Sequence, residues 1–87
     1  MLTISRKEIQ NSYLIDLLAR RHVLYAKINA FEKQYGASFD AFEQKIKKKD
    51  ENFAEWDDYI EWKAYKEAYN DIEKRIEDVK NGNFEIS

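Results

Sequence analysis

The shortage of chain-breaking residues constrains the fold of this chain more than any other feature. Its 87 residues include no proline and only two glycines, Gly36 and Gly82. Long helices can therefore continue without interruption, whereas Gly-rich phosphate loops, Pro-rich linkers and a turn-dense β-sandwich are excluded. The chain also lacks cysteine, which excludes disulfides, zinc–thiolate sites and thiol nucleophiles. We predict an all-α fold in a single domain, residues 1–87.

Composition indicates a folded protein outside the membrane. Charged residues make up 37% of the chain and aromatic residues 15%, which is typical neither of disordered chains nor of membrane proteins. No apolar run approaches the roughly 18 residues of a membrane span, and residues 1–8 lack the apolar stretch of a signal peptide. We therefore expect a soluble, cytoplasmic protein with no membrane partner.

Capping patterns predict where three helices begin and end. Ser5 and Glu8 form a capping box ahead of a helix that runs to Gly36, a suitable left-handed C-cap. Ser38 caps a short second helix, and Asn52 opens a third with a second capping box. The predicted helices span about residues 6–35, 39–48 and 53–80, and a tail follows at 81–87.

The two long helices carry matching apolar seams whose members alternate three and four residues apart. Their members are Leu14, Leu17, Arg21, Leu24, Ile28, Phe31 and Tyr35 in the first helix, and Trp62, Tyr65, Tyr69, Ile72, Ile76 and Val79 in the third. Such seams pack as an antiparallel coiled-coil hairpin. Arg21 should not be buried without a partner, so we expect it to pair with Glu73, Glu77 or Asp78.

The short helix is expected to bracket the start of the third helix. The early part of that helix shows a separate apolar stripe, and the short helix offers apolar residues at a matching spacing. The stripe is Phe53, Trp56, Ile60 and Ala64, and its expected cover is Phe39, Phe42 and Ile46.

The first helix has more apolar surface than one neighbouring helix can cover, since a second apolar face lies beyond its seam. We expect a second copy of the chain to cover this face, giving a homodimer and a four-helix assembly. The alternative is that a different protein binds there. The expected dimer interface consists of Ile15, Leu18, Ala19, His22, Ala26 and Ala30.

Charge is divided unevenly along the chain. Residues 1–49 hold ten Lys or Arg against five Asp or Glu, whereas residues 50–87 hold five against twelve. The two halves could neutralise each other in a hairpin, or either could recruit an oppositely charged partner. Nucleic acid is disfavoured, because the only dense basic run is Lys45–Lys49 and the pI is about 5.4.

No catalytic motif is present, so we expect a non-enzymatic protein with no cofactor. Glu55, Asp58 and Glu61 have the spacing with which all-α nucleotide pyrophosphohydrolases hold magnesium, and such an enzyme is one alternative. The first helix, however, offers only widely separated carboxylates, and the single histidine, His22, has no ligand partner at helical spacing. We therefore predict no metal site.

Aromatic residues beside carboxylates make the start of the third helix our predicted partner-binding surface. Exposed Tyr and Trp are typical anchors of protein interfaces, although the same rings could belong to the core. The predicted surface consists of Trp56, Asp57, Asp58, Tyr59, Glu61 and Trp62.

The cap and aromatic pattern of residues 35–43 (YGASFDAFE) and 52–64 (NFAEWDDYIEWKA) resembles that of small helical prokaryotic proteins encoded beside a toxin gene. The resemblance covers about the last two thirds of the chain. It implies an antitoxin-like protein that neutralises a toxin by direct contact, generally as a dimer. The chain lacks a ribbon-helix-helix, a helix-turn-helix and a swapped-hairpin barrel, so the resemblance does not extend to DNA binding. The alternative is a structural homodimer or adaptor with no toxin partner.

Overall fold

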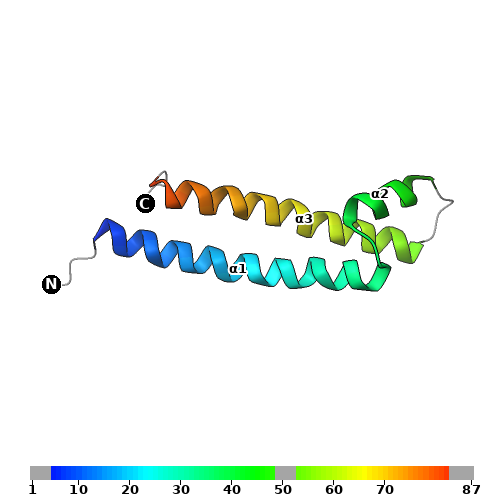
Figure 1. Cartoon of the computed structure of the whole chain (residues 1–87), viewed down its shortest axis with the longest axis horizontal. Helices are drawn as coiled ribbons and strands as arrows, with labels where there is room; N and C mark the ends of the chain where they lie inside the picture. The colour runs from blue at the N-terminus through cyan, green and yellow to red at the C-terminus, as the bar shows by residue number, and fades with distance from the viewer. Residues whose placement is uncertain (1–4, 49–52, 83–87) are drawn as a thin grey trace.

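The computed structural model of the chain describes residues 5–48 and 53–82. Its three helices are α1 (Arg6–Tyr35), α2 (Phe39–Lys48) and α3 (Phe53–Lys80). The long helices α1 and α3 lie side by side and antiparallel, and α2 folds back onto the first half of α3 (Figure 1). No strand occurs in these two ranges. The predicted all-α hairpin with a short helix between two long ones is confirmed.

The predicted caps explain the helix boundaries. Ser5 Oγ accepts a hydrogen bond from the Glu8 amide at 3.1 Å, and Ser38 Oγ accepts one from the Ala41 amide at 3.2 Å. Gly36 ends α1 with a left-handed φ of 61°, and the following amide, that of Ala37, donates to the Glu32 carbonyl at 3.3 Å. Asn52 and the tail beyond residue 82 lie outside the described residues.

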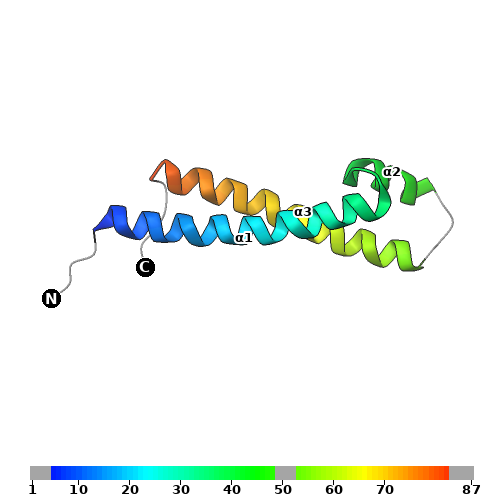
Figure 2. The ribbon, with the colours of Figure 1, turned by 60° about the horizontal axis from the view of Figure 1, so that its bottom comes forward.

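The seams of α1 and α3 meet along their whole length, and their apolar contacts form two clusters. The clusters are centred on buried Ile28, Phe42, Ile46, Tyr59 and Trp62 near α2, and on buried Leu17, Ile76 and Val79 near the termini. Figure 2 shows that α3 crosses α1 at an inclination, as coiled-coil packing requires.

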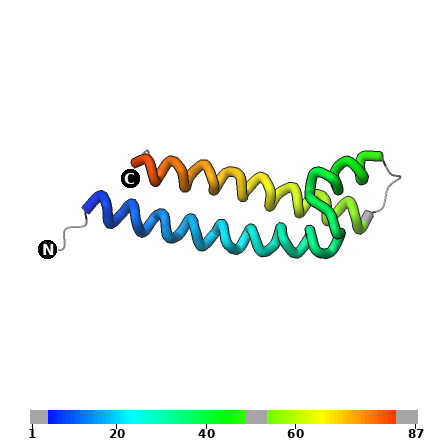
Figure 3. The backbone as a smooth tube through the Cα atoms, in the orientation of Figure 1, coloured from blue at the N-terminus to red at the C-terminus, as the bar shows by residue number. Residues whose placement is uncertain are grey.

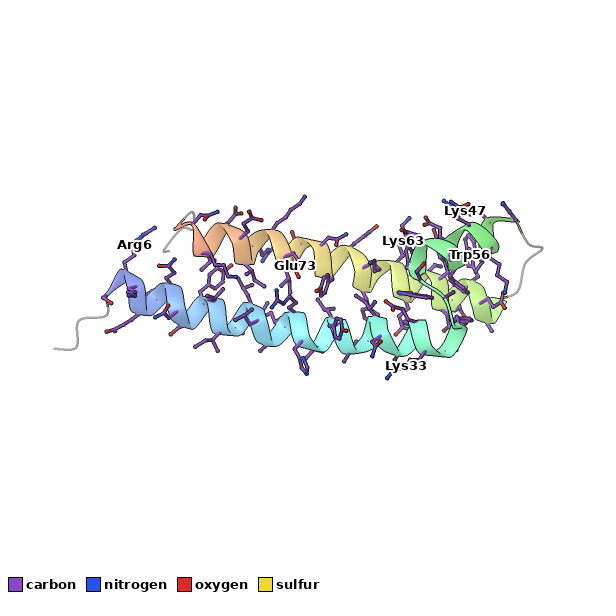
Figure 4. All side chains as sticks on the ribbon, viewed as in Figure 1. Arg6, Lys33, Lys47, Trp56, Lys63 and Glu73 are labelled. Carbon is purple, nitrogen blue, oxygen red and sulfur yellow. The ribbon has the colours of Figure 1, made fainter. Side chains whose placement is uncertain are left out.

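An ion pair lies between the two clusters. Arg21 Nη1 is 3.4 Å from Glu73 Oε1, and Glu73 extends from α3 toward α1 (Figure 4). Glu73 is one of the three partners that the sequence predicted for Arg21. The pair joins the middle of α1 to α3, and it satisfies the one charged residue of the α1 seam.

The position of α2 corrects one prediction. The chain reverses at the end of α1 and lays α2 against α3 (Figure 3). Phe42 and Ile46 pack on Tyr59 and Trp62, so α2 does not cover Trp56 and Ile60 of the expected stripe. The predicted packing of α2 on the start of α3 is observed, but the contact lies roughly a third of a helical turn away from that stripe.

The molecule is elongated, measuring 63 × 19 × 18 Å. Its radius of gyration is 17.6 Å, against about 12 Å for a compact domain of this length. Within residues 5–48 and 53–82, a hairpin only two helices wide leaves much of the outer side of each long helix exposed.

Candidate protein-interaction surface

The outer side of α3 exposes two large apolar side chains near its start. Trp56 is 46% exposed and Ile60 54% exposed, and they lie one turn apart on the same face. Asp57 and Glu61, each the next residue along the chain, are also exposed. We call these four residues the α3 patch. Figure 4 shows Trp56 at the end of the molecule that carries α2.

The Trp56 ring is held in place by the rings beneath it. Its centroid lies 5.3 Å from that of Tyr59, and the Tyr59 ring stacks on Phe39 at 5.7 Å with an interplanar angle of 3°. The Tyr59 hydroxyl donates a hydrogen bond to Glu43 Oε2 at 2.7 Å, which ties it to α2. Trp56 therefore rests on a fixed aromatic support, and less side-chain freedom is lost when a partner binds.

Two residues of the predicted partner-binding surface are core residues instead. Tyr59 is buried, and Trp62 is fully buried with 0% of its surface exposed. Trp62 stacks on Phe31 with centroids 5.4 Å apart. Neither ring can touch a partner in this conformation. Ile60 was not predicted to be exposed, because we expected α2 to cover the stripe to which it belongs.

Asp58 has a structural role at the joint between α1 and α3. It accepts hydrogen bonds from the Tyr35 hydroxyl and, at 3.3 Å, from Gln34 Nε2. Burial of the phenol and the nearby Asp58 carboxylate raise the pKa of Tyr35 to about 12. Asp58 therefore holds the end of α1 against α3 rather than facing outward.

Two of the three carboxylates whose spacing could have suggested a metal site, those of Asp58 and Glu61, are engaged in other contacts. Asp58 accepts from Tyr35 and Gln34, and Glu61 Oε1 accepts from the Tyr65 hydroxyl at 2.6 Å. Within residues 5–48 and 53–82, no three His, Asp or Glu side chains are grouped so that they could hold a metal ion.

The outer side of α1 is also exposed, and no other described helix packs on it. Ile15 is 67% exposed and Val23 is 53% exposed. We call this surface the α1 outer face; its members are Ile15, Ala19, His22, Val23, Ala26 and Ala30, all of them exposed. Leu18, which we had expected in the dimer interface, instead packs at the edge of the cluster around Leu17. Val23 was missed.

The opposite charges of the two halves meet directly at Arg21 and Glu73. The other ion pairs found between described residues each lie within one helix and join residues four apart: Arg20 with Asp16, Lys47 with Glu43, and Arg75 with Asp71. Exposed pairs of this kind contribute little to stability. The surplus of negative charge on α3 thus stays largely at the surface.

Comparison of the chain with protein-family models, with curated proteins and with solved structures gives no match. Among the described helices, none combines the length and the apolar character needed to cross a membrane.

Proposed function

We propose that this chain is a non-enzymatic protein-interaction module, an antitoxin-like protein that acts in the cytoplasm and neutralises a basic toxin by direct contact. The observation that carries the proposal is the pair Trp56 and Ile60, exposed on the outer side of α3 between carboxylates. Large apolar side chains framed by polar groups are typical of protein-binding sites.

The energetic argument concerns Trp56 first. Trp is the residue type most enriched among interface residues whose truncation costs 2 kcal/mol or more. Trp56 is already oriented by Tyr59, as a preformed anchor should be. A partner that covered only the Trp56 ring would leave Ile60 exposed. We therefore expect the partner to cover both side chains.

The charge around the α3 patch argues for a basic partner. Residues 54–67 hold five Asp or Glu and two Lys, a net charge of −3. Complementary charge speeds encounter and selects among partners more than it adds affinity. A nuclease toxin with a basic substrate groove is the class of partner that fits this surface and the resemblance noted above.

Affinity capture from an extract of the native cell tests the proposal. The tagged wild-type chain should retain one small basic protein, and Trp56→Ala and Asp57→Lys should each lower its recovery at least tenfold. Tyr25→Ala and Asp78→Lys are matched controls, since they remove an exposed ring and reverse an exposed charge elsewhere. Recovery that is equal for Trp56→Ala and Tyr25→Ala would contradict the proposal.

A second candidate function is that of a structural homodimer or adaptor without a toxin. The α1 outer face favours it, because this surface is more apolar than a solvated helix face needs to be. Under this alternative, capture would yield only the chain itself, whichever α3 variant is used.

A further inference from the structure

We propose that a second copy of this chain covers the α1 outer face, with the two α1 helices antiparallel and in one register. In that register Ile15 of each copy faces Ala26 of the other, and Ala19 faces His22. The proposal does not depend on the toxin partner, because it concerns the opposite side of the molecule from the α3 patch.

The chain exposes more area than a compact monomer of its mass. Its accessible surface is 6825 Å², whereas a monomeric protein of 10.5 kDa exposes about 5,400 Å². The excess of about 1,400 Å² exceeds the roughly 800 Å² that each partner contributes to a standard interface. A side-by-side pairing of two long helices is the simplest way for an elongated hairpin to lose this excess.

The spacing of the α1 outer face fits a coiled-coil seam. Ile15, Ala19, His22 and Ala26 alternate four, three and four residues apart, which is the heptad pattern. Antiparallel pairing in the proposed register places each large side chain opposite an alanine. Two helices can then approach closely without a gap or a clash.

Charge selects the antiparallel direction and supports the same register. Continuing the seam in both directions brings Glu8 of one copy opposite Lys33 of the other, twice per dimer. Both residues are exposed, and Lys33 extends from the side of α1 that faces away from α3 (Figure 4). A parallel pairing would instead place each Lys33 beside its equivalent, and each His22 likewise. Asp16 and Arg20, which flank the seam, already neutralise each other at 3.1 Å.

Disulfide trapping tests the register directly, because the chain has no cysteine of its own. Ile15→Cys and Ala26→Cys are made as separate chains, mixed, and oxidised mildly. In the proposed register residues 15 and 26 of different copies are neighbours, whereas two copies of residue 15 lie about 16 Å apart along the axis, beyond the reach of a disulfide. The masses of the two variants differ, so mass spectrometry separates the cross-linked species.

We expect the mixed 15–26 species to exceed either self-linked species at least tenfold. The pair Ile15→Cys with Ala30→Cys is the control for a one-turn shift and should cross-link at least fivefold more slowly. Predominance of self-linked species for both variants would overturn the antiparallel direction, and predominance of self-linked Ala26→Cys alone or faster linking to residue 30 would overturn the register.

Sedimentation equilibrium of the unlinked chain completes the test. The wild type should be a dimer, and Ala26→Glu should be a monomer with an unchanged helical circular dichroism spectrum. Ala41→Glu, on the exposed side of α2, is the matched control and should stay dimeric. A monomeric wild type, or a dimer that survives Ala26→Glu, would overturn the proposal.

Discussion

At the scale of single residues, the fold depends most on Trp62. Its ring lies between those of Phe31, Phe39 and Phe42, with centroids 5.2 to 5.5 Å away. The indole Nε1 is buried, and no group among the described residues accepts a hydrogen bond from it. Trp62 therefore stabilises the chain through apolar burial and ring contacts alone.

Trp62→Ala should lower the free energy of unfolding by about 3–5 kcal/mol, the usual cost of removing a buried aromatic side chain. Trp56→Ala should lower it by less than about 1 kcal/mol, because that ring is nearly half exposed. Urea denaturation followed by circular dichroism measures both. Equal losses for the two variants would show that Trp62 is not the centre of the core.

The Tyr35–Asp58 contact predicts how stability depends on pH. The pKa of Tyr35 is raised to about 12, from about 10 in the unfolded chain. The folded state therefore holds this proton more tightly, and the stabilisation is complete below pH 10 and is lost as the pH rises toward 12. Hydrogen bonds to carboxylates raise the pKa of Tyr59, Tyr65 and Tyr69 in the same direction.

Unfolding experiments at pH 8 to 12 should show this loss for the wild type, and Tyr35→Phe should reduce its size. Below pH 10 the variant should be less stable by about 1 kcal/mol, because Asp58 loses one donor. If the wild type and Tyr35→Phe lose the same amount of stability between pH 8 and 12, groups other than Tyr35 cause the loss.

At the scale of helices, local signals were predictable from the sequence and the rotation of α2 was not. Caps such as Ser5, Gly36 and Ser38 act within four residues, so they specify boundaries wherever the chain lies. The ion pair of Arg21 followed from the seams. The side of α3 that α2 covers depends on the direction in which residues 36–38 leave α1, and no periodicity encodes this direction.

The unpredicted position of α2 on α3 explains most of the differences between the predicted and the observed candidate site. Trp56 and Tyr59 are three residues apart, which is less than one helical turn. A modest shift of α2 around the axis of α3 therefore exchanges which of the two rings is buried. The sequence therefore identified a segment of α3 that has exposed apolar side chains, but not which rings face outward. The outer side of α1 was easier to identify, since its exposed members lie on the same helix directly opposite the seam.

The turn after α1 offers a test of the local argument. Gly36→Ala should destabilise the chain by about 1–2 kcal/mol, because φ is 61° and a side chain with Cβ disfavours this region. Apart from the adjacent backbone, a Cβ at this position would meet no atom within 4 Å, so the cost comes from the local backbone conformation and not from crowding by packed neighbours. Gly36→Asn should lose less, since asparagine tolerates the left-handed region. Equal losses in thermal unfolding would contradict this explanation.

At the scale of the whole molecule, the hairpin presents two different surfaces on opposite sides. The α1 outer face is largely apolar, whereas the α3 patch combines two exposed apolar side chains with carboxylates. A dimer formed through α1 in the proposed register would leave both α3 patches exposed, roughly 45 Å apart along the axis. If the proposed toxin partner binds the α3 patch, such a dimer would hold two toxin molecules, one at each end.

The most direct test of this account is the mass of the complex that the tagged chain captures from its native cell extract, measured under native conditions. The account predicts two copies of the chain with two copies of one small basic protein, and a bare dimer for Trp56→Ala. A complex of one chain with one basic protein would contradict the proposed dimer but not the proposed toxin partner. A wild-type chain that elutes as a bare homodimer would contradict the proposed toxin partner and leave a structural homodimer.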